Sequence, residues 1–435
     1  MNPTTIEIVG TVLFALAVIH TFFVKKFEDL SHKYPEGSIG ENLFHFLGEV
    51  EAVFGIWAAV FIGFYSCIKG FSVYDESHHV IGGALHYLES QNFTEPAFVF
   101  VIMCMAATKP IIFFAKKLIL AFSKLIPVNG KMAFYMSALI LGPILGSFIT
   151  EPAAMTVTAL ILLDNFYAKE MSKTFKYATI GVLFVNISVG GTLSHFAAPP
   201  VLMVASKYGW GLTHMLTHFG WKASIGVVVN AIAVSLIFKN ELKGRASTKD
   251  DHPTEMKPPI WVVLVHLLFM GFVVYTAHHM VFFMGLFLFF IGFTTVTGEY
   301  QSRLKIKESL LVGFFLAGLV TLGSVQQWWL QDILTKMGST ALFYGSAALT
   351  GITDNAALTY LGSLVDLSDS SKYFLVAGAV SGGGLTVIAN APNPAGFGIL
   401  KGSFGEEGIS PLKLLLGAIA PTVVVLLCFQ FLPYL

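Results

Sequence analysis

Two acidic residues stand inside otherwise apolar stretches, in closely similar contexts. Glu151 lies in residues 149–156 (ITEPAAMT) and Asp354 lies in residues 352–359 (ITDNAALT), which share five identical positions. An ionised carboxylate near the centre of a membrane costs roughly 2.5–3.5 kcal/mol on insertion scales, so such residues are functional by default. The chemistry open to the pair is the binding of a proton or of a metal cation.

Neither carboxylate has an evident basic partner, because no Lys or Arg falls in the central part of an apolar run. We therefore expect a mobile counter-charge, either H⁺ or Na⁺, and competition of the two for one carboxylate is the minimum machinery of an antiporter. Each acid could instead cap the half-helix that follows it by accepting backbone N–H bonds. Pro152 suits the first position of such a helix.

Neighbouring oxygen atoms could complete the shell of a hard cation such as Na⁺. The expected ligands beside the two carboxylates are Thr150, Thr353, Asn355, Asn390 and Asn393. No resident metal and no cofactor is expected.

Four further residues are secondary candidates. Glu49 and Glu51 are two positions apart and point to different faces, so at most one of them should line the interior. Asn186 is a weaker candidate ligand. His195 could titrate near neutral pH, although a single histidine at such a place is more often a packing residue.

Two glycine- and proline-rich motifs are expected to break the helices that contain them. Gly190 and Gly191 are followed by Pro199 and Pro200, and the second half repeats the order. The repeated motif consists of Gly383, Gly384 and Pro392. Such breaks free backbone carbonyls and helix N-termini for ions, whereas the alternative is that they only allow kinks and close packing.

The composition predicts a membrane protein. Of 435 residues, 55% are hydrophobic and 12% are charged, with mean hydropathy +0.73, whereas soluble domains carry about 25% charged residues. The apolar runs are about 20 residues long, as a membrane helix requires. The first apolar run is expected to be a retained span rather than a signal peptide. The sequence contains no Walker A motif and no HExxH motif, so neither an ATP-driven pump nor a zinc protease is expected.

We expect an all-α polytopic membrane protein with two inverted-topology repeats, about 10 spanning helices, two re-entrant helical hairpins and two broken helices. The first repeat covers 1–238, with its hairpin at 132–167 and its broken helix at 174–206. A cytoplasmic linker covers 239–258, and the second repeat covers 259–435, with its hairpin at 339–366 and its broken helix at 372–400. The remaining expected spans are 4–24, 43–68, 95–115, 220–238, 259–278, 280–297, 308–329 and 412–434.

The basic residues indicate the orientation. With both termini outside and both hairpins re-entrant, most of the 26 Lys and Arg residues fall on the inner side, as the positive-inside rule requires. The expected location is the inner (plasma) membrane, with the lipid bilayer as partner and no nucleic acid.

The motifs GGTLSHFAAPP (190–200) and GGGLTVIANAPNP (382–394) resemble the glycine-rich broken helices of the ion transporter superfamily, in particular its NhaD-like Na⁺/H⁺ antiporters. The resemblance implies a homodimer in which a transport domain carrying both hairpins moves, elevator-like, against a static scaffold. The anion symporters of that superfamily carry Ser-Asn-Thr at the hairpin tips. Here the tips are Thr150-Glu151-Pro152 and Thr353-Asp354-Asn355, and an added carboxylate would repel an anion.

The sequence therefore favours a secondary transporter that exchanges Na⁺ (or Li⁺) for H⁺. The alternative is a Na⁺- or H⁺-coupled symporter of an organic or inorganic anion.

Overall fold

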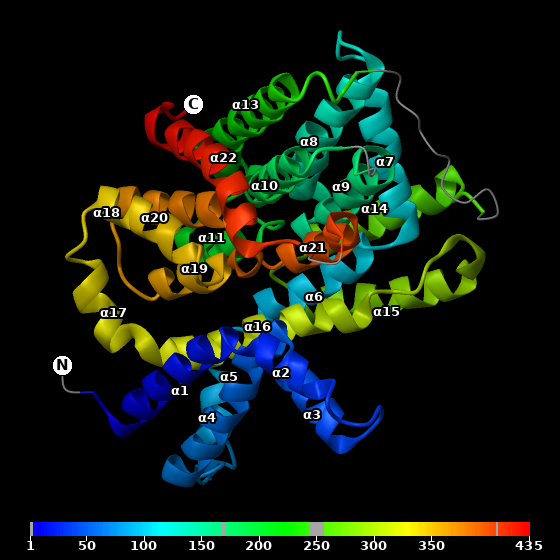
Figure 1. Cartoon of the computed structure of the whole chain (residues 1–435). Coiled ribbons are helices and arrows are strands. Elements are labelled where there is room, and N and C mark those ends of the chain that lie inside the picture. The colour runs from blue at the N-terminus through cyan, green and yellow to red at the C-terminus, as the bar shows by residue number, and fades with distance from the viewer. Residues whose placement is uncertain (1–2, 168–170, 244–255, 406–407) are drawn as a thin grey trace.

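The computed structural model describes residues 3–167, 171–243, 256–405 and 408–435, and nearly all of this is helical (Figure 1). Most of the expected linker 239–258 therefore lies outside the described residues. The helices of the N-terminal half are α1 Thr5–Thr21, α2 Val24–Ser31, α3 Ile39–Leu47, η1 Val50–Ala52, α4 Val53–Lys69, α5 Gly83–Glu89, α6 Thr94–Ala106, α7 Lys109–Ser123, α8 Gly130–Ile149, α9 Glu151–Phe166, α10 Lys173–Gly190, η2 Gly191–Leu193, α11 Pro199–Tyr208, α12 Leu212–His214, η3 Met215–Gly220 and α13 Trp221–Ile237.

The C-terminal half has fewer elements in its described residues. Its helices are α14 Ile260–Tyr275, α15 Met280–Val296, η4 Gly298–Tyr300, α16 Ile306–Gly323, η5 Ser324–Gln326, α17 Gln327–Leu334, α18 Ser339–Thr350, α19 Asn355–Ser363, α20 Asp369–Gly382, η6 Val387–Ala389, α21 Asn393–Lys401, η7 Gly402–Phe404 and α22 Pro411–Phe431. One antiparallel pair of short strands, β1 Val73–Tyr74 and β2 Val80–Gly82, follows α4 and was not expected from the sequence.

By length and composition, six helices in the described part of the chain could cross a membrane. They are Val50–Lys69, Gly130–Ile149, Lys173–Leu193, Leu212–Ile237, Ile306–Leu334 and Pro411–Phe431. Two bent pairs, α1 with α2 and α6 with α7, raise the number to eight if each is one span, and α14 and α15 are shorter apolar helices. The chain is thus a multi-pass helical membrane protein, and the expectation of about ten spans stays a prediction.

Two of the expected spans are interrupted. The run 95–115 is divided between α6 and α7, which meet at 69°. Pro110 stands in the first turn of α7. In a continuous helix its ring would clash with the carbonyl of Ala106, where α6 ends. The run 43–68 is divided at Gly48, where an added Cβ would lie 3.0 Å from the backbone nitrogen of Glu28. The chain of α2 therefore packs directly on this break.

The helices form two groups (Figure 1). The helices α1, α4, α6, α14, α15 and α16 pack on one another, and α16 contacts α1, α4 and α6. In the second group α8 packs on α9, α18 on α20, and α10 on α13 and α22. The two halves of the chain are interlocked there, since α11 packs against α19 and α21 packs against α9.

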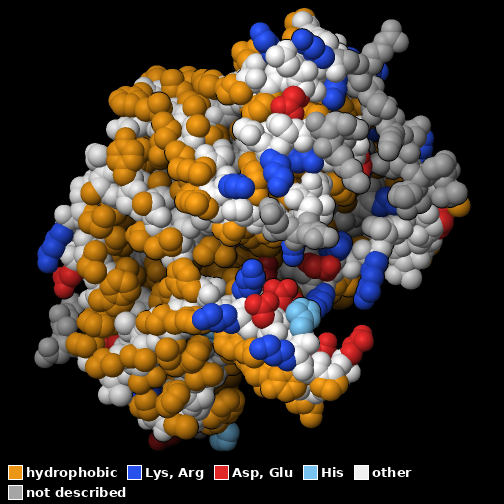
Figure 2. Space-filling model, viewed as in Figure 1, with side chains coloured by type: hydrophobic (Ala, Val, Ile, Leu, Met, Phe, Trp, Pro, Cys, Tyr) orange, Lys and Arg blue, Asp and Glu red, His pale blue; other side chains and the backbone are white. Residues whose placement is uncertain are grey.

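The outer surface matches a lipid environment. Large hydrophobic side chains are exposed along α14, α15 and α22. On the face shown in Figure 2, hydrophobic side chains cover most of the left part and the lower edge, while most Lys and Arg lie from the top through the centre to the right. Both termini lie on the left of the same view in Figure 1.

Candidate functional site

Glu151 stands at a sharp turn between two helices. α8 ends at Ile149 and α9 begins at Glu151, so that Thr150 alone connects them. Thr150 has φ 71° and ψ 151°, a region that is essentially restricted to glycine and costs about 1–3 kcal/mol. Packing over-determines this conformation, because Thr150 is 2% exposed. Strain of this kind clusters at binding sites and switch regions.

The Glu151 carboxylate is fully buried, at 0% exposure. Its Oε2 accepts a hydrogen bond of 2.9 Å from Nδ2 of Asn390, and its Oε1 has no hydrogen-bond partner. Within the described residues no ion pair joins it to a basic side chain. A buried charge without a partner is strongly disfavoured, so this carboxyl group needs a proton or a cation.

Glycine at position 191 makes room for this carboxylate. A Cβ at Gly191 would lie 2.4 Å from Oε1 of Glu151, well inside van der Waals contact. Gly190 packs equally closely on the carbonyl oxygen of Pro143, at 2.6 Å from an added Cβ. The first break therefore lies directly against the hairpin tip.

Several oxygens around the second break are also buried and unpaired. They are Oγ1 of Thr150 and the side-chain oxygens of Asn355, Asn390 and Asn393. Nδ2 of Asn393 donates to the carbonyls of Gly383 (2.7 Å) and Thr386 (2.8 Å), which fixes the amide. The unpaired side-chain oxygens of these four residues are hard donors of the kind that Na⁺ binds.

Asp354 is placed differently from Glu151. It precedes α19, and its Oδ1 accepts hydrogen bonds from the backbone N–H groups of Ala356 (2.8 Å) and Ala357 (3.0 Å). It therefore caps α19, whereas Glu151 makes no such cap at α9. Asp354 is half-buried and faces a pocket, as Thr353 does; the hydroxyl of Thr353 donates to the carbonyl of Leu349 (2.8 Å).

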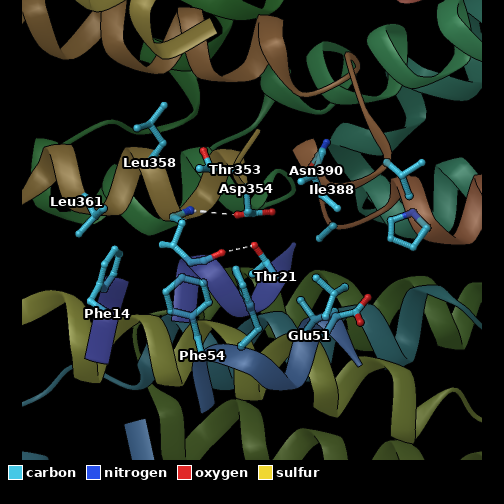
Figure 3. A pocket seen from close by; sticks show the side chains of 18 residues that line it. Phe14, Thr21, Glu51, Phe54, Thr353, Asp354, Leu358, Leu361, Ile388 and Asn390 are labelled. Atoms are coloured by element: carbon cyan, nitrogen blue, oxygen red, sulfur yellow. Dashed lines mark hydrogen bonds between the residues drawn. The ribbon is translucent and has the colours of Figure 1, made fainter. Parts of the chain in front are cut away.

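This first pocket lies between the two helix groups (Figure 3). One wall comes from α1, η1, α4 and α16, and the other from α19 and the second break. Its open space is about 830 Å³. The residues that line it are Phe14, Val18, Thr21, Val50, Glu51, Phe54, Val312, Phe315, Thr353, Asp354, Ala357, Leu358, Leu361, Val387, Ile388, Asn390, Ala391 and Pro394. None of them is basic, and the charged ones are both acidic.

Glu49 and Glu51, the two glutamates of the second expected span, lie in different environments. Glu51 lines the first pocket, on the wall opposite Asp354 (Figure 3). Glu49 is 28% exposed at its side chain and lies 3.8 Å from Nδ1 of His45 and 3.9 Å from Nζ of Lys307. Only Glu51 therefore shares a cavity with a hairpin-tip carboxylate.

The structure does not bring Asn186 into this group. Its Nδ2 donates to the carbonyls of Leu139 (2.9 Å) and Val227 (3.1 Å), and its oxygen accepts from Asn230 (3.0 Å). Every polar atom of the Asn186 side chain is thus engaged in holding α10 to α8 and α13. His195 lies apart from the first pocket as well, in a smaller cavity described below.

The remaining motif residues shape the breaks. Pro199 and Pro200 open α11, and Pro392 directly precedes α21. A Cβ at Gly383 would lie 2.1 Å from Oγ of Ser188, and one at Gly384 would lie 2.4 Å from the backbone of Val185. The two broken helices can approach each other this closely because these positions are glycine.

Sequence reasoning missed two serines that tie the breaks together. Oγ of Ser147 donates to the carbonyl of Gly190 (2.7 Å) and accepts from the N–H of Leu193 (2.9 Å). Oγ of Ser188 donates to the carbonyl of Val380 (2.7 Å) and so links α10 to α20. The sequence signal that could have found them is a serine shortly before a hairpin tip, as at Ser147, or shortly before a double glycine, as at Ser188.

Two lysines are buried, but neither neutralises the carboxylates. Nζ of Lys222 donates to the hydroxyl of Tyr373 (2.9 Å), and Nζ of Lys176 donates to the carbonyl of Ser403 (3.0 Å). Lys222 is 1% exposed. Its burial is compensated by the Tyr373 hydroxyl and by the ring of Tyr434, whose centroid lies 4.2 Å away.

Comparison with known protein families identifies the family of the chain. The chain matches, over residues 5–432, a family model described as "Putative Na+/H+ antiporter". No curated protein matches it. Because the match covers nearly the whole chain, the protein belongs to this family of Na⁺/H⁺ antiporters, and it is a membrane transporter of cations and protons.

Proposed function

We propose that the protein exchanges Na⁺ (or Li⁺) for H⁺, with Glu151 and Asp354 alternately binding the cation and the proton. The observation that carries this proposal is the state of Glu151. Its carboxylate is fully buried, has one amide partner and one unpaired oxygen, and forms no ion pair with a basic side chain among the described residues. Only a mobile positive charge can compensate it.

In this mechanism Na⁺ enters through the first pocket, past Glu51 and Asp354. It displaces the proton of a hairpin-tip carboxyl and is held by that carboxylate and by the unpaired oxygens of Thr150, Asn355, Asn390 and Asn393. Since the proton and the cation use the same oxygens, the binding of one requires the release of the other. Exchange then follows when the loaded site opens to the opposite side.

Two features of the first pocket weigh against an anion as cargo. Its lining contains Glu51 and Asp354 but no Lys or Arg, so its potential disfavours anions. The pocket is otherwise apolar, with few groups that could hold a carboxylate or phosphate in a fixed orientation. The family match points to cations as well.

We further propose the inverted-repeat architecture and the orientation inferred from the sequence. On the face shown in Figure 2, most Lys and Arg lie away from the left edge, where both termini lie in Figure 1, and this supports a cytoplasmic face on the other side and outer termini. A homodimer and an elevator-like movement follow from the resemblance to NhaD-like members of the ion transporter superfamily. The interface between the two helix groups, which contains the first pocket, is where such a movement would occur.

The proposal is tested by proton release from everted vesicles. Adding Na⁺ or Li⁺ to energised vesicles should dissipate the pH gradient when the wild-type protein is present, and Asp354→Asn and Glu151→Gln should abolish the response. Asp366→Asn and Glu299→Gln are matched controls, because these carboxylates are exposed and should leave the response intact.

A specific result would contradict the exchanger. If Glu151→Gln and Asp354→Asn, present at wild-type amounts, release protons as the wild type does, the carboxylates do not carry the exchange. Uptake of an anion driven by Na⁺, with no movement of protons, would favour the symporter instead.

A further inference from the structure

The structure has a second, smaller pocket lined by titratable side chains that the proposed mechanism does not use. It is lined by Glu95, Phe98, His195, Phe196, Leu202, Ala205, Ser206, Ala277 and His278. Its open space is about 330 Å³, against about 830 Å³ for the first pocket. Nδ1 of His195 is buried there without a hydrogen-bond partner.

We propose that this second pocket is the closed counterpart of the first, and that Glu95, His195 and His278 line the path by which H⁺ and Na⁺ reach Glu151 from the opposite side of the membrane. This proposal rests on the exchange function proposed above. It is carried by the correspondence between the elements that form the two pockets.

The first correspondence concerns the breaks. His195 stands five residues after Gly190, and Ile388 stands five residues after Gly383. His195 lines the second pocket and Ile388 lines the first. The fifth residue after the first glycine of the motif therefore lines a pocket in both halves: the second pocket in the N-terminal half and the first pocket in the C-terminal half.

The second correspondence concerns α6 and α16, which pack closely where Gly313 faces α6. A Cβ at Gly313 would lie 3.1 Å from Cβ of Phe100 and 3.2 Å from the carbonyl oxygen of Pro96. Each of the two helices supplies residues to one pocket near this contact. Glu95 and Phe98 line the second pocket, whereas Val312 and Phe315 line the first.

The third correspondence concerns the connections that enter α4 and α15. Glu51 stands two residues before α4 begins, and His278 stands two residues before α15 begins. A titratable side chain from the equivalent place in the chain thus lines each pocket. The packing of the moving parts shows the same relation, since α11 contacts α19 and α21 contacts α9.

The proposal relates these pairs by a two-fold axis in the membrane plane that runs between α6 and α16. Such an axis places the two pockets on opposite sides of the membrane. The first pocket is the larger of the two, so in this proposal the first pocket is the access path that is open in this conformation. Exchanging the conformations of the two halves would close the first pocket and open the second.

The chemistry of the second pocket suits small cations and protons. Glu95 and His278 are near enough to interact electrostatically, and so are His278 and His195. No group of three His, Cys, Asp or Glu residues in the described part of the chain could hold a metal ion, so these three residues do not form a fixed metal site. A carboxylate followed by two imidazoles can instead pass a proton toward the first break.

Thiol labelling in the full-length protein tests the sidedness. Cys67, Cys104 and Cys428 are replaced, and single cysteines are introduced as Ala205→Cys in the second pocket and Val50→Cys in the first. A positively charged, membrane-impermeant methanethiosulfonate is applied to right-side-out and to everted vesicles. We expect Val50→Cys to react from one side only and Ala205→Cys from the other side only, with Na⁺ changing the two rates in opposite directions.

Transport measurements test the titratable residues. Glu95→Gln should lower the rate of Na⁺-driven proton release by about tenfold or more while leaving Na⁺ binding to the detergent-solubilised protein unchanged. Glu89→Gln removes an exposed carboxylate of α5 and serves as the matched control with a wild-type rate.

The proposal is overturned if Ala205→Cys reacts from the same side as Val50→Cys or from neither side in any ion condition. An unchanged exchange rate in Glu95→Gln would overturn the role of that carboxylate. If the wild type showed no Na⁺/H⁺ exchange, the exchange function would fail, while opposite-sided labelling would still show the second pocket to be an access path.

Discussion

Replacing Gly191 by alanine should weaken Na⁺ binding without unfolding the protein. The added methyl group would lie 2.4 Å from Oε1 and 2.6 Å from Cγ of Glu151. Ordinary contact begins near 3.4 Å, so the carboxyl group must move by about 1 Å. The side chain is flexible at that end, but it is fully buried and can move only by leaving its present neighbours.

The expected magnitude follows from the contact that would be lost. Moving the carboxyl group away from Gly191 disturbs the 2.9 Å hydrogen bond from Asn390. A hydrogen bond to a charged group contributes about 1.5–3 kcal/mol, and each 1.4 kcal/mol is a factor of ten in affinity. The apparent Na⁺ affinity of Gly191→Ala should therefore fall by about 10- to 150-fold.

The assay is a Na⁺ titration of proton release in proteoliposomes that contain a pH-sensitive dye. Gly398→Ala is the matched control, since Gly398 lies on α21 and an added Cβ there meets no atom within 4 Å. Thermal unfolding of both variants checks that they are folded. A folded Gly191→Ala with the wild-type Na⁺ affinity would refute the reasoning, because the Glu151 carboxylate would then not be a ligand.

Three further predictions concern neighbouring residues. Asn390→Ala removes the same hydrogen bond from its other end, so the apparent Na⁺ affinity should fall by about 10- to 150-fold. Combining Asn390→Ala with Gly191→Ala should cause little further loss of affinity. Na⁺ titration of the double variant measures this, and additive losses would contradict it. Asn186→Ala should lower the free energy of unfolding by about 1–3 kcal/mol while Na⁺ affinity stays unchanged, as thermal unfolding and Na⁺ titration can show; a loss of affinity at wild-type stability would contradict its structural role. Thr150→Gly should relieve about 1–3 kcal/mol of backbone strain and so raise the unfolding temperature. The same variant should bind Na⁺ more weakly because Oγ1 is lost. An unchanged Na⁺ affinity would exclude that oxygen from the ion site.

The helical breaks and hairpin tips could be placed from the sequence because glycine, proline and isolated acids are unusual inside apolar runs. The structure ends α8 at Ile149 and α10 at Gly190, beside the predicted positions. The division of the run 95–115 could also have been predicted, since Pro110 marks it. The division at Gly48 could not, because it depends on the packing of α2 against that residue.

The partners of individual side chains were beyond the sequence. Asn186 and Asn390 are both asparagines near a break, yet one is fully hydrogen-bonded between helices and the other holds Glu151. Nothing in their local sequences separates these roles, which depend on contacts between distant segments. The second pocket was missed for the same reason, since Glu95 and His278 meet only in the folded chain.

The most direct measurement is the number of protons released when Na⁺ binds to the purified protein in weakly buffered detergent solution. Competition at a shared carboxyl group predicts that protons are released as Na⁺ saturates the protein, and that Glu151→Gln releases fewer or none. Saturable Na⁺ binding without any proton release, in a protein shown to be folded, would contradict the claim that the cation and the proton share the buried carboxylates.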